Sequence, residues 1–294
     1  MAFPTGTESS TTLAVMIPQL WGTKINDFYR QKLKLAAFFT NRSDELAGGG
    51  DTVYTPGLTE MAANSKTNAT QVTLNQPTET KQTLQVSNWF EVSFAIEDNQ
   101  AAQVLKSYSI QQRYMKNAAY TAAKKLEVAL ATGFQSFTTV VGTTTVALAD
   151  ASVRSAISSA EIANIDFEEC VWFLHPKTVW TDLMSIDRFA LSLNTANATN
   201  PVVKGQMGTI YGQPLVTTNL ITKINTNADY CGALAVADSI HFATGALPGQ
   251  RDQNGVRLQA NYVPDFLSTV ITADILYGTV VNRAAGGIKI VSGV

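Results

Sequence analysis

The chain has 294 residues, enough for one large domain or two ordinary ones with an ample core. Apolar residues make up 45% of the sequence, as in globular proteins, but charged residues make up only 15%, well below the usual quarter. The net charge of −2 gives no overall basic field for nucleic acid, and no apolar run is long enough to span a membrane. A chain so poor in charge can hide much of its surface against partners, although secreted β-rich proteins have similar compositions.

Residues 1–20 are rich in Ser and Thr and predict an extended arm. They lack the basic start and apolar core of a signal peptide, so we expect the protein to stay in a reducing, cytosol-like compartment. Apolar periodicity then predicts a short helix over residues 23–39. Its basic face is a solvated surface or, alternatively, an inward contact to nucleic acid. The cations of this face are Lys24, Arg30, Lys32 and Lys34.

Residues 51–58 predict a strand that ends at Pro56 and Gly57. Thr, Asn and Gln supply 13 of the 22 residues from 64 to 85, where alternating runs at 70–76 and 81–86 predict a hairpin that turns at residues 77–79. A lone hairpin with so few apolar residues cannot stabilise itself in water, so it is a mobile loop or an arm that lies on a neighbouring subunit. The candidate contacts to that neighbour are Lys66, Asn68, Val72, Leu74, Lys81 and Leu84.

A strand over residues 86–98 feeds into the longest predicted element, a helix over residues 98–133. About 34 residues at 1.5 Å each make a rod of roughly 50 Å. Its Ala-rich stripe faces inward, its lysines and arginines face solvent, and Gly133 stands where a left-handed C-terminal residue belongs. The helix is a spine that carries a mixed sheet or, alternatively, an ordinary long core helix.

The second half of the chain alternates strands and helices. The expected elements are two short strands around Gly142, a helix over 150–161, a buried central strand over 170–176, a helix from Pro176, a surface loop over 190–207, two strands over 208–219 that bend at residues 212–214, an apolar strand over 231–245, and strands of one final sheet over 256–294 with breaks at Pro264, Gly278 and residues 286–287. The class is therefore α+β with a mixed sheet and a protruding arm.

Nothing in the sequence concentrates catalytic groups. Nucleotide-binding, metalloprotease and hydrolase motifs are absent from it. His175 and His241 stand near strand ends and predict turn or core residues with satisfied nitrogens; a hydrolase built on His175 would need a carboxylate and a nucleophile beside it. Cys170 and Cys231 predict buried reduced thiols in strands, with a disulfide or a metal role as the alternatives. We therefore expect no enzyme, no cofactor and no metal.

Three stretches, VWFLHPKTVWTDL, GTIYGQPLVTTNLI and ITADILYGTVVNRAAGGIKIVSG, follow the polar arm, the hairpin and the long helix. In this order the chain resembles the major capsid proteins of tailed bacteriophages, which have the HK-97-like fold. The resemblance implies an N-terminal arm, an extended hairpin called the E-loop, a spine helix, an A-domain and a mixed-sheet P-domain. The implied boundaries are residues 1–45, 46–97, 98–144, 145–250 and, for the closing P-domain strands, 251–294.

The resemblance also implies a structural protein that assembles into pentamers and hexamers of an icosahedral shell around double-stranded DNA. It places the protein in the virion, and in the host cytoplasm during assembly, with DNA contacted non-specifically. The chain shows no charged scaffolding segment at its start, so a separate scaffolding protein or none is expected, with portal and decoration proteins as further partners. Some relatives cross-link a hairpin Lys to an Asn, but Lys66 and Lys81 are expected to be ordinary solvated lysines. An encapsulin-like compartment shell and a tail or adhesion protein are the alternatives.

Overall fold

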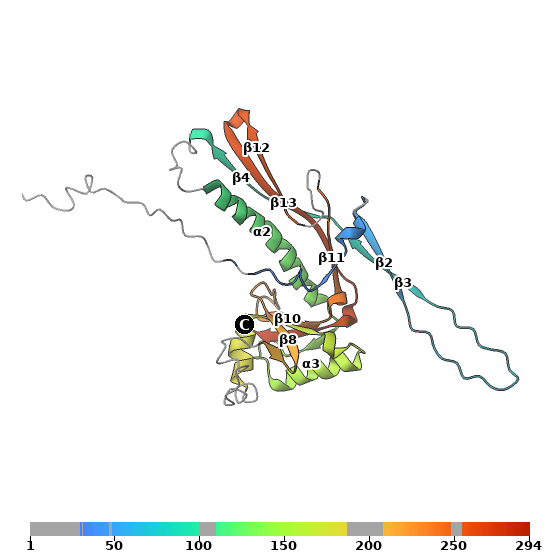
Figure 1. Ribbon diagram of the computed structural model, residues 1–294. Helices are drawn as coiled ribbons and strands as arrows, with labels where there is room; N and C mark the ends of the chain where they lie inside the picture. The colour runs from blue at the N-terminus through green and yellow to red at the C-terminus, as the bar shows by residue number, and fades with distance from the viewer. Residues whose placement is uncertain (1–29, 31, 47–48, 100–109, 187–207, 248–254) are drawn as a thin grey trace, which may run out of the picture.

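The computed structural model describes residues 30, 32–46, 49–99, 110–186, 208–247 and 255–294. Two sheets, two long helices and one projecting hairpin dominate these residues, so the mixed α+β class is confirmed (Figure 1). None of the described helices is both long and apolar enough to cross a membrane.

The first sheet has five strands built around one long strand. In spatial order these are β1 (Thr40–Asn41), β11 (Ile240–Thr244), β13 (Ser268–Val281) and β12 (Arg257–Val263), with β4 (Asn88–Glu97) on the other edge of β13. Gly278 was expected to break this region, but it lies inside β13, where a Cβ would collide with the Gln85 carbonyl oxygen. This glycine lets the base of the projecting hairpin approach β13 closely.

The second sheet has seven strands. Their order is β5 (Thr139–Val141), β14 (Gly287–Gly293), β10 (Asp229–Ala235), β6 (Val171–Leu174), β8 (Gln213–Thr217) and β7 (Thr209–Ile210), with β9 (Lys223–Ile224) paired to β10. All four residues of β6 are buried, which confirms the central strand. Helix α3 (Asp150–Ile162) forms where a helix was predicted, over residues 150–161, and its buried residues pack on this sheet. Only one of the two strands expected around Gly142 forms.

Smaller local predictions meet mixed outcomes in this half. Pro176 begins a helical segment as expected, and this segment continues as a π-helical turn over Thr178–Asp182. Strands β7 and β8 form the predicted pair but turn one residue earlier, at Tyr211 and Gly212, which both have positive φ. The predicted loop over 190–207 lies outside the described residues.

Two crossings of the chain between the sheets, from β10 to β11 and from β13 to β14, correct the sequence prediction. The apolar run 231–245 is not one strand, because a 3-10 turn at Ala237–Ser239 separates β10 from β11. The strands after residue 256 do not form one sheet, because β14 pairs with β10 and β5. The backbone amides of Asn282 and Arg283 donate to the Ser239 carbonyl at 2.9 and 3.3 Å, so the two crossings hold each other.

Helix α2 (Ile110–Gly133) confirms the long helix over its described part, and Asp98 and Asn99 are also helical, while residues 100–109 lie outside the described residues. Ala122, Leu126 and Leu130 of its expected stripe are buried, and the buried Ala118 extends this stripe by one turn. Gly133 is not left-handed: its φ and ψ are −56° and −29°, and the chain continues into a 3-10 turn. A Cβ at this position would lie 3.0 Å from Cδ1 of Ile240, so a larger residue would require the Ile240 side chain to shift.

The prediction of a helix over residues 23–39 is wrong for residues 32–39, which are not helical. Of the remaining residues of this prediction, the structure describes only Arg30. This segment is an irregular turn whose Leu35 and Phe39 enter the core between α2 and the two sheets. The buried carboxylate of Glu127 on α2 accepts hydrogen bonds from the backbone amides of residues 34–36 at 2.9–3.1 Å. Three amides aimed at one carboxylate replace the bonds that a helix would have made.

One ionic cluster ties together three strands of the five-stranded sheet. Arg257 on β12 donates to both carboxylate oxygens of Asp274 on β13, at 2.9 and 2.6 Å, and Nε1 of Trp89 on β4 donates at 3.0 Å. Burial by itself raises the pKa of the Asp274 carboxyl, but the hydrogen bonds from Arg257 and Trp89 outweigh it and hold that pKa below its usual range. The charged carboxylate is therefore the form that stabilises the folded sheet.

This cluster predicts a pH dependence of stability. Because the folded pKa of Asp274 is lowered, its contribution is present above the ordinary pKa of about 3.9 and is lost as the pH falls through the folded value. Asp274→Asn is expected to lower the unfolding free energy near neutral pH by about 3 kcal/mol, since it leaves the Arg257 charge without its partner. Urea unfolding at several pH values measures both effects. A variant that loses as much stability on acidification as the wild type would contradict this role.

Candidate assembly surfaces

The most prominent surface is a hairpin that projects from the body (Figure 1). It consists of β2 (Thr52–Leu58) and β3 (Glu79–Gln85), paired antiparallel over seven residues each. Residues 59–78 between them form an extended loop without further strand pairing. A projecting hairpin is present, but the predicted pairing of residues 70–76 with residues 81–86 about a turn at residues 77–79 is wrong, because β2 takes the place of the first run. The run 70–76 has no buried face, whereas β2 supplies Val53, which packs with β3.

The root of the hairpin belongs to the core of the subunit. Leu84 is 1% exposed and packs with Val53, Val86 and Ala243. Leu84 is therefore wrong as a candidate contact to a neighbour, because no partner can reach it. A single apolar residue in a polar run is a signal for such an anchor, but its partner Val53 lies 31 positions earlier, beyond the reach of a local pattern.

The other candidate contacts lie on the exposed part of the hairpin. Lys66, Asn68, Val72 and Leu74 are all in the loop, where Val72 is 61% and Leu74 is 87% exposed. Lys81 lies on β3 with its ammonium group 4.2 Å from the ring centre of Tyr54. Their contact with a neighbour stays a prediction. The loop is joined across its width by few bonds, among them Asn64 to Asn75 at 2.7 Å, so it has no core of its own.

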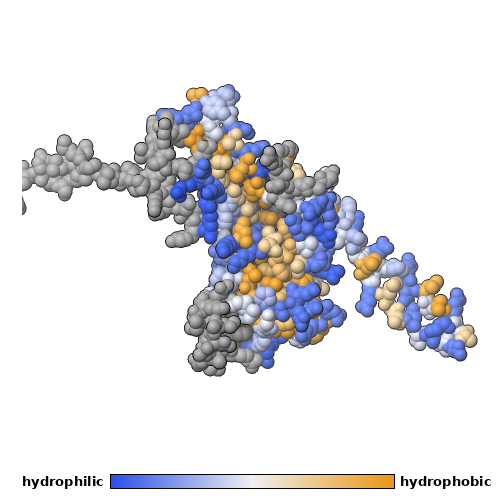
Figure 2. Space-filling model, in the orientation of Figure 1, coloured by the Kyte–Doolittle hydropathy of each residue, from blue (hydrophilic) through white to orange (hydrophobic). Residues whose placement is uncertain are grey.

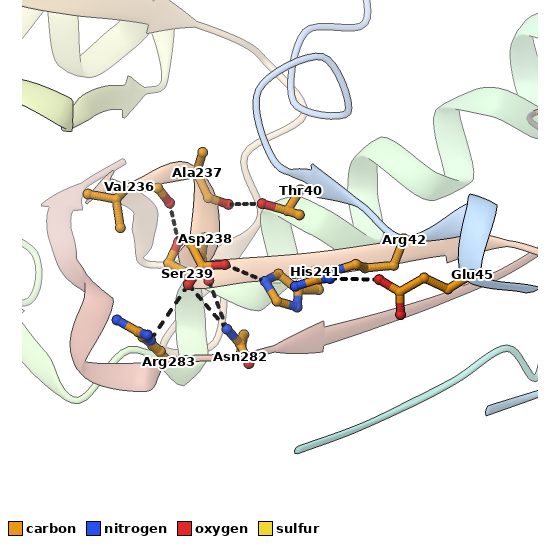
Figure 3. A network of polar contacts seen from close by, with 10 residues as sticks. All are labelled: Thr40, Arg42, Glu45, Val236, Ala237, Asp238, Ser239, His241, Asn282 and Arg283. Atoms are coloured by element: carbon orange, nitrogen blue, oxygen red, sulfur yellow. Dashed lines mark hydrogen bonds and ion pairs between the residues drawn. The ribbon is translucent and has the colours of Figure 1, made fainter. Parts of the chain in front are cut away.

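A second candidate surface is the junction of the two sheets, where an open groove of about 940 Å³ is lined on one side by residues 163–169 and on the other by the two crossings. Asp238 organises the crossings: it binds His241 at 2.7 Å and also contacts Asn282 and Arg283 (Figure 3). His241 is a core residue, as predicted, but its Nδ1 is buried without a partner, so the expectation of two satisfied nitrogens is wrong.

The other residues singled out for chemistry occupy structural positions. The His175 ring stacks on Tyr230 at 3.7 Å and accepts a bond from the Lys177 amide; burial, then the charges of Lys223 and Lys177, lower its pKa. Cys170 and Cys231 are free and buried, as expected, although only Cys231 lies within a strand. Burial raises the pKa of both thiols to about 11, and Asp166 and Glu169 add to the effect at Cys170.

Sequence reasoning missed Glu127, which fixes where the N-terminal segment leaves the body. Its side chain is 2% exposed, and Lys34 adds a hydrogen bond from Nζ to the Thr217 carbonyl of the seven-stranded sheet.

The substitution Glu127→Gln keeps the size of the side chain but puts an NH₂ group where an oxygen accepts hydrogen bonds from backbone amides. We expect faster hydrogen exchange at the amides of residues 34–36 and a loss of about 1–3 kcal/mol in stability. Unchanged protection of these three amides would contradict the role of the carboxylate.

No known protein-family description matches the chain, and no curated relative matches it. Its structure, however, is similar to solved phage structures over nearly its whole length. A chain of Mycobacterium phage Che8 is 18% identical with a TM-score of 0.74, and the match covers 93% of this chain and 96% of that one. The capsid of cyanophage P-SCSP1u gives 13% identity, a TM-score of 0.75 and coverage of 98% and 96%. The head structure of Helicobacter pylori bacteriophage KHP40 is 11% identical with a TM-score of 0.70, and the match covers 99% of this chain and 99% of that one.

The chain therefore has the fold of phage capsid subunits. The fold expected from the resemblance is confirmed at this level. The boundaries of the A-domain and the P-domain stay predictions.

Proposed function

We propose that this protein is the major capsid protein of a tailed phage, a structural subunit of an icosahedral shell around double-stranded DNA. The observation that carries the proposal is the likeness to capsid structures over 98% of the chain for the cyanophage and 99% for the Helicobacter phage. A similarity of this extent leaves little of the chain for another activity. The protein would reside in the virion, and in the host cytoplasm while shells assemble.

The exposed surface supports self-assembly. The described residues expose large apolar side chains at both ends of the molecule: Met61, Val72 and Leu74 on the hairpin loop, and Phe266 and Leu267 at the turn between β12 and β13. Contiguous exposed apolar groups mark interaction sites. Since different parts of the surface are involved, identical copies would meet head to tail, and such contacts close into rings when the rotation allows it. Pentamers and hexamers are the rings that an icosahedral shell requires.

Negative-stain electron microscopy of the purified full chain, together with sizing at low and high salt, tests the proposal. We expect closed polyhedral shells or rings of five and six subunits, with a separate scaffolding protein added if the chain alone stays small. Portal and decoration proteins would join the shell later. A monodisperse monomer in every condition, with candidate scaffolding protein included, would contradict the proposal.

A further inference from the structure

The charges of this protein are distributed unevenly, although its net charge is only −2. Helix α2 carries four cations, and its one carboxylate, Glu127, is buried and already bound by backbone amides. In contrast, residues 161–169 hold four carboxylates and no cation. A chain that is nearly neutral overall thus has a helix whose charges, apart from the buried Glu127, are all cationic and lie between residues 113 and 125. The four cations of α2 are Arg113, Lys116, Lys124 and Lys125.

Three of these cations lie in one strip, whereas the ammonium group of Lys125 lies 5.2 Å from the ring centre of Phe90 on β4. Arg113, Lys116, Tyr120 and Lys124 follow one another at steps of three and four residues, which places them on one face of the helix. Lys116 and Lys124 are exposed, and the buried stripe through Ala122 faces the opposite side. In Figure 2, hydrophilic side chains lie along the outer edge of the region that α2 occupies in Figure 1.

The N-terminal segment fills the gap in the middle of the strip. The guanidinium of Arg30 lies 6.0 Å from the ring centre of Tyr120, between Lys116 and Lys124 along the helix. Lys32 is exposed two residues further on. The Glu127 carboxylate holds residues 34–36 against α2 and so anchors to the helix the segment that carries these two cations. Two segments far apart in sequence therefore contribute to one basic surface.

We propose that this surface, the outer face of α2 with Arg30 and Lys32 beside it, is the side of the subunit that contacts the phosphate backbone of packaged duplex DNA. This proposal rests on the proposed function, and it adds which side of the subunit faces the inside of the shell. The strip from Arg113 to Lys124 is about 16 Å long, and a duplex carries one charge per about 1.7 Å of its axis, so the length of duplex beside the strip carries roughly 10 phosphates, of which only those on the near side can be reached. The contact is electrostatic and independent of sequence, because lysine and arginine on a convex rod reach phosphates and not base edges.

The acidic residues 161–169 of a second copy are the competing partner for this strip. Asp166 and Glu169 line the groove at the junction of the sheets, which is concave and also contains Arg283. A straight cationic rod fits a duplex better than it fits a groove with a cation in it. Binding of a second copy is therefore an outcome that the experiment must separate from DNA binding.

The test uses the full chain as dissociated subunits and a fluorescent duplex of about 20 base pairs, which is longer than the helix. Affinity is measured across a salt series for the wild type, for Lys116→Gln/Lys124→Gln, and for Lys223→Gln as a control that removes an exposed lysine from β9. The logarithm of the affinity is expected to fall linearly with the logarithm of salt concentration. The double variant is expected to lower the slope by about 1.8, and the control by much less.

Shell assembly of the same proteins is scored by electron microscopy. Normal shells from the double variant, with the lowered salt slope, would support the proposal. No salt-dependent binding by the wild type, or equal slopes for wild type and double variant, would overturn it. Failed assembly with unchanged DNA binding would overturn it too and assign the strip to a contact between copies. If the wild type forms no shells even with candidate scaffolding protein added, but the slopes differ as expected, the proposed function fails while the basic DNA-binding surface stands.

Discussion

A subunit that lacks most of the hairpin loop is expected to fold normally and to form no closed shells. The change removes residues 60–77 and joins Thr59 to Thr78 through an Asn-Gly turn. These two threonines already lie opposite each other, with a backbone bond of 3.3 Å, so β2 and β3 should keep their register. The loop contributes no buried residue to the subunit, whereas its exposed apolar groups are among those offered to a neighbour. The measurement is electron microscopy, with a thermal melt to establish folding.

Two point variants separate the loop from its root. Leu74→Ser alters a side chain that is 87% exposed and should leave the melting temperature unchanged while it weakens assembly. Leu84→Ala alters a side chain that is 1% exposed and should cost about 2–5 kcal/mol of stability, because it leaves a cavity. Normal particles from the loop deletion would refute the role of the hairpin as an arm between subunits.

The elements that the sequence predicted well are those defined by local periodicity. Helix α2 shows its buried stripe at steps of three and four, and β6 is a continuous apolar run that no solvent-facing strand would have. These patterns depend only on which face is buried, so they can be seen in a short window. The resemblance then placed the elements in a capsid-type fold, which periodicity alone does not specify.

The largest errors lie where a distant residue decides the local structure. The apolar run 231–245 is divided because the amides of Asn282 and Arg283 bond to Ser239, more than 40 residues earlier in the chain. The segment over 32–39 is not helical because Glu127 binds its amides from about 90 positions away. Strand β3 pairs with β2 across the loop because Leu84 and Val53 share a core. No local pattern contains these partners.

The substitution Ala122→Asp is expected to prevent folding. Ala122 is 0% exposed in the middle of the α2 stripe, within the core cluster that joins the helix to both sheets. A carboxylate there would have no partner and would lose its hydration, which costs roughly 4 kcal/mol or more, while a domain has about 5–15 kcal/mol of stability in total. Expression should therefore give insoluble or unfolded protein, as measured by solubility and by circular dichroism.

Lys124→Asp is the matched control, because it puts the same residue into the same helix on the exposed side. It carries the same intrinsic helix preference and changes the charge more, so a difference between the two variants reports burial and not propensity. We expect the Lys124 variant to fold with a stability change of about 0.5–1 kcal/mol. Soluble, assembly-competent protein with Asp at position 122 would mean that a different face of α2 packs on the sheets. In that case the cationic strip would no longer face outward, and the assignment of a DNA-facing side to α2 would fall with it.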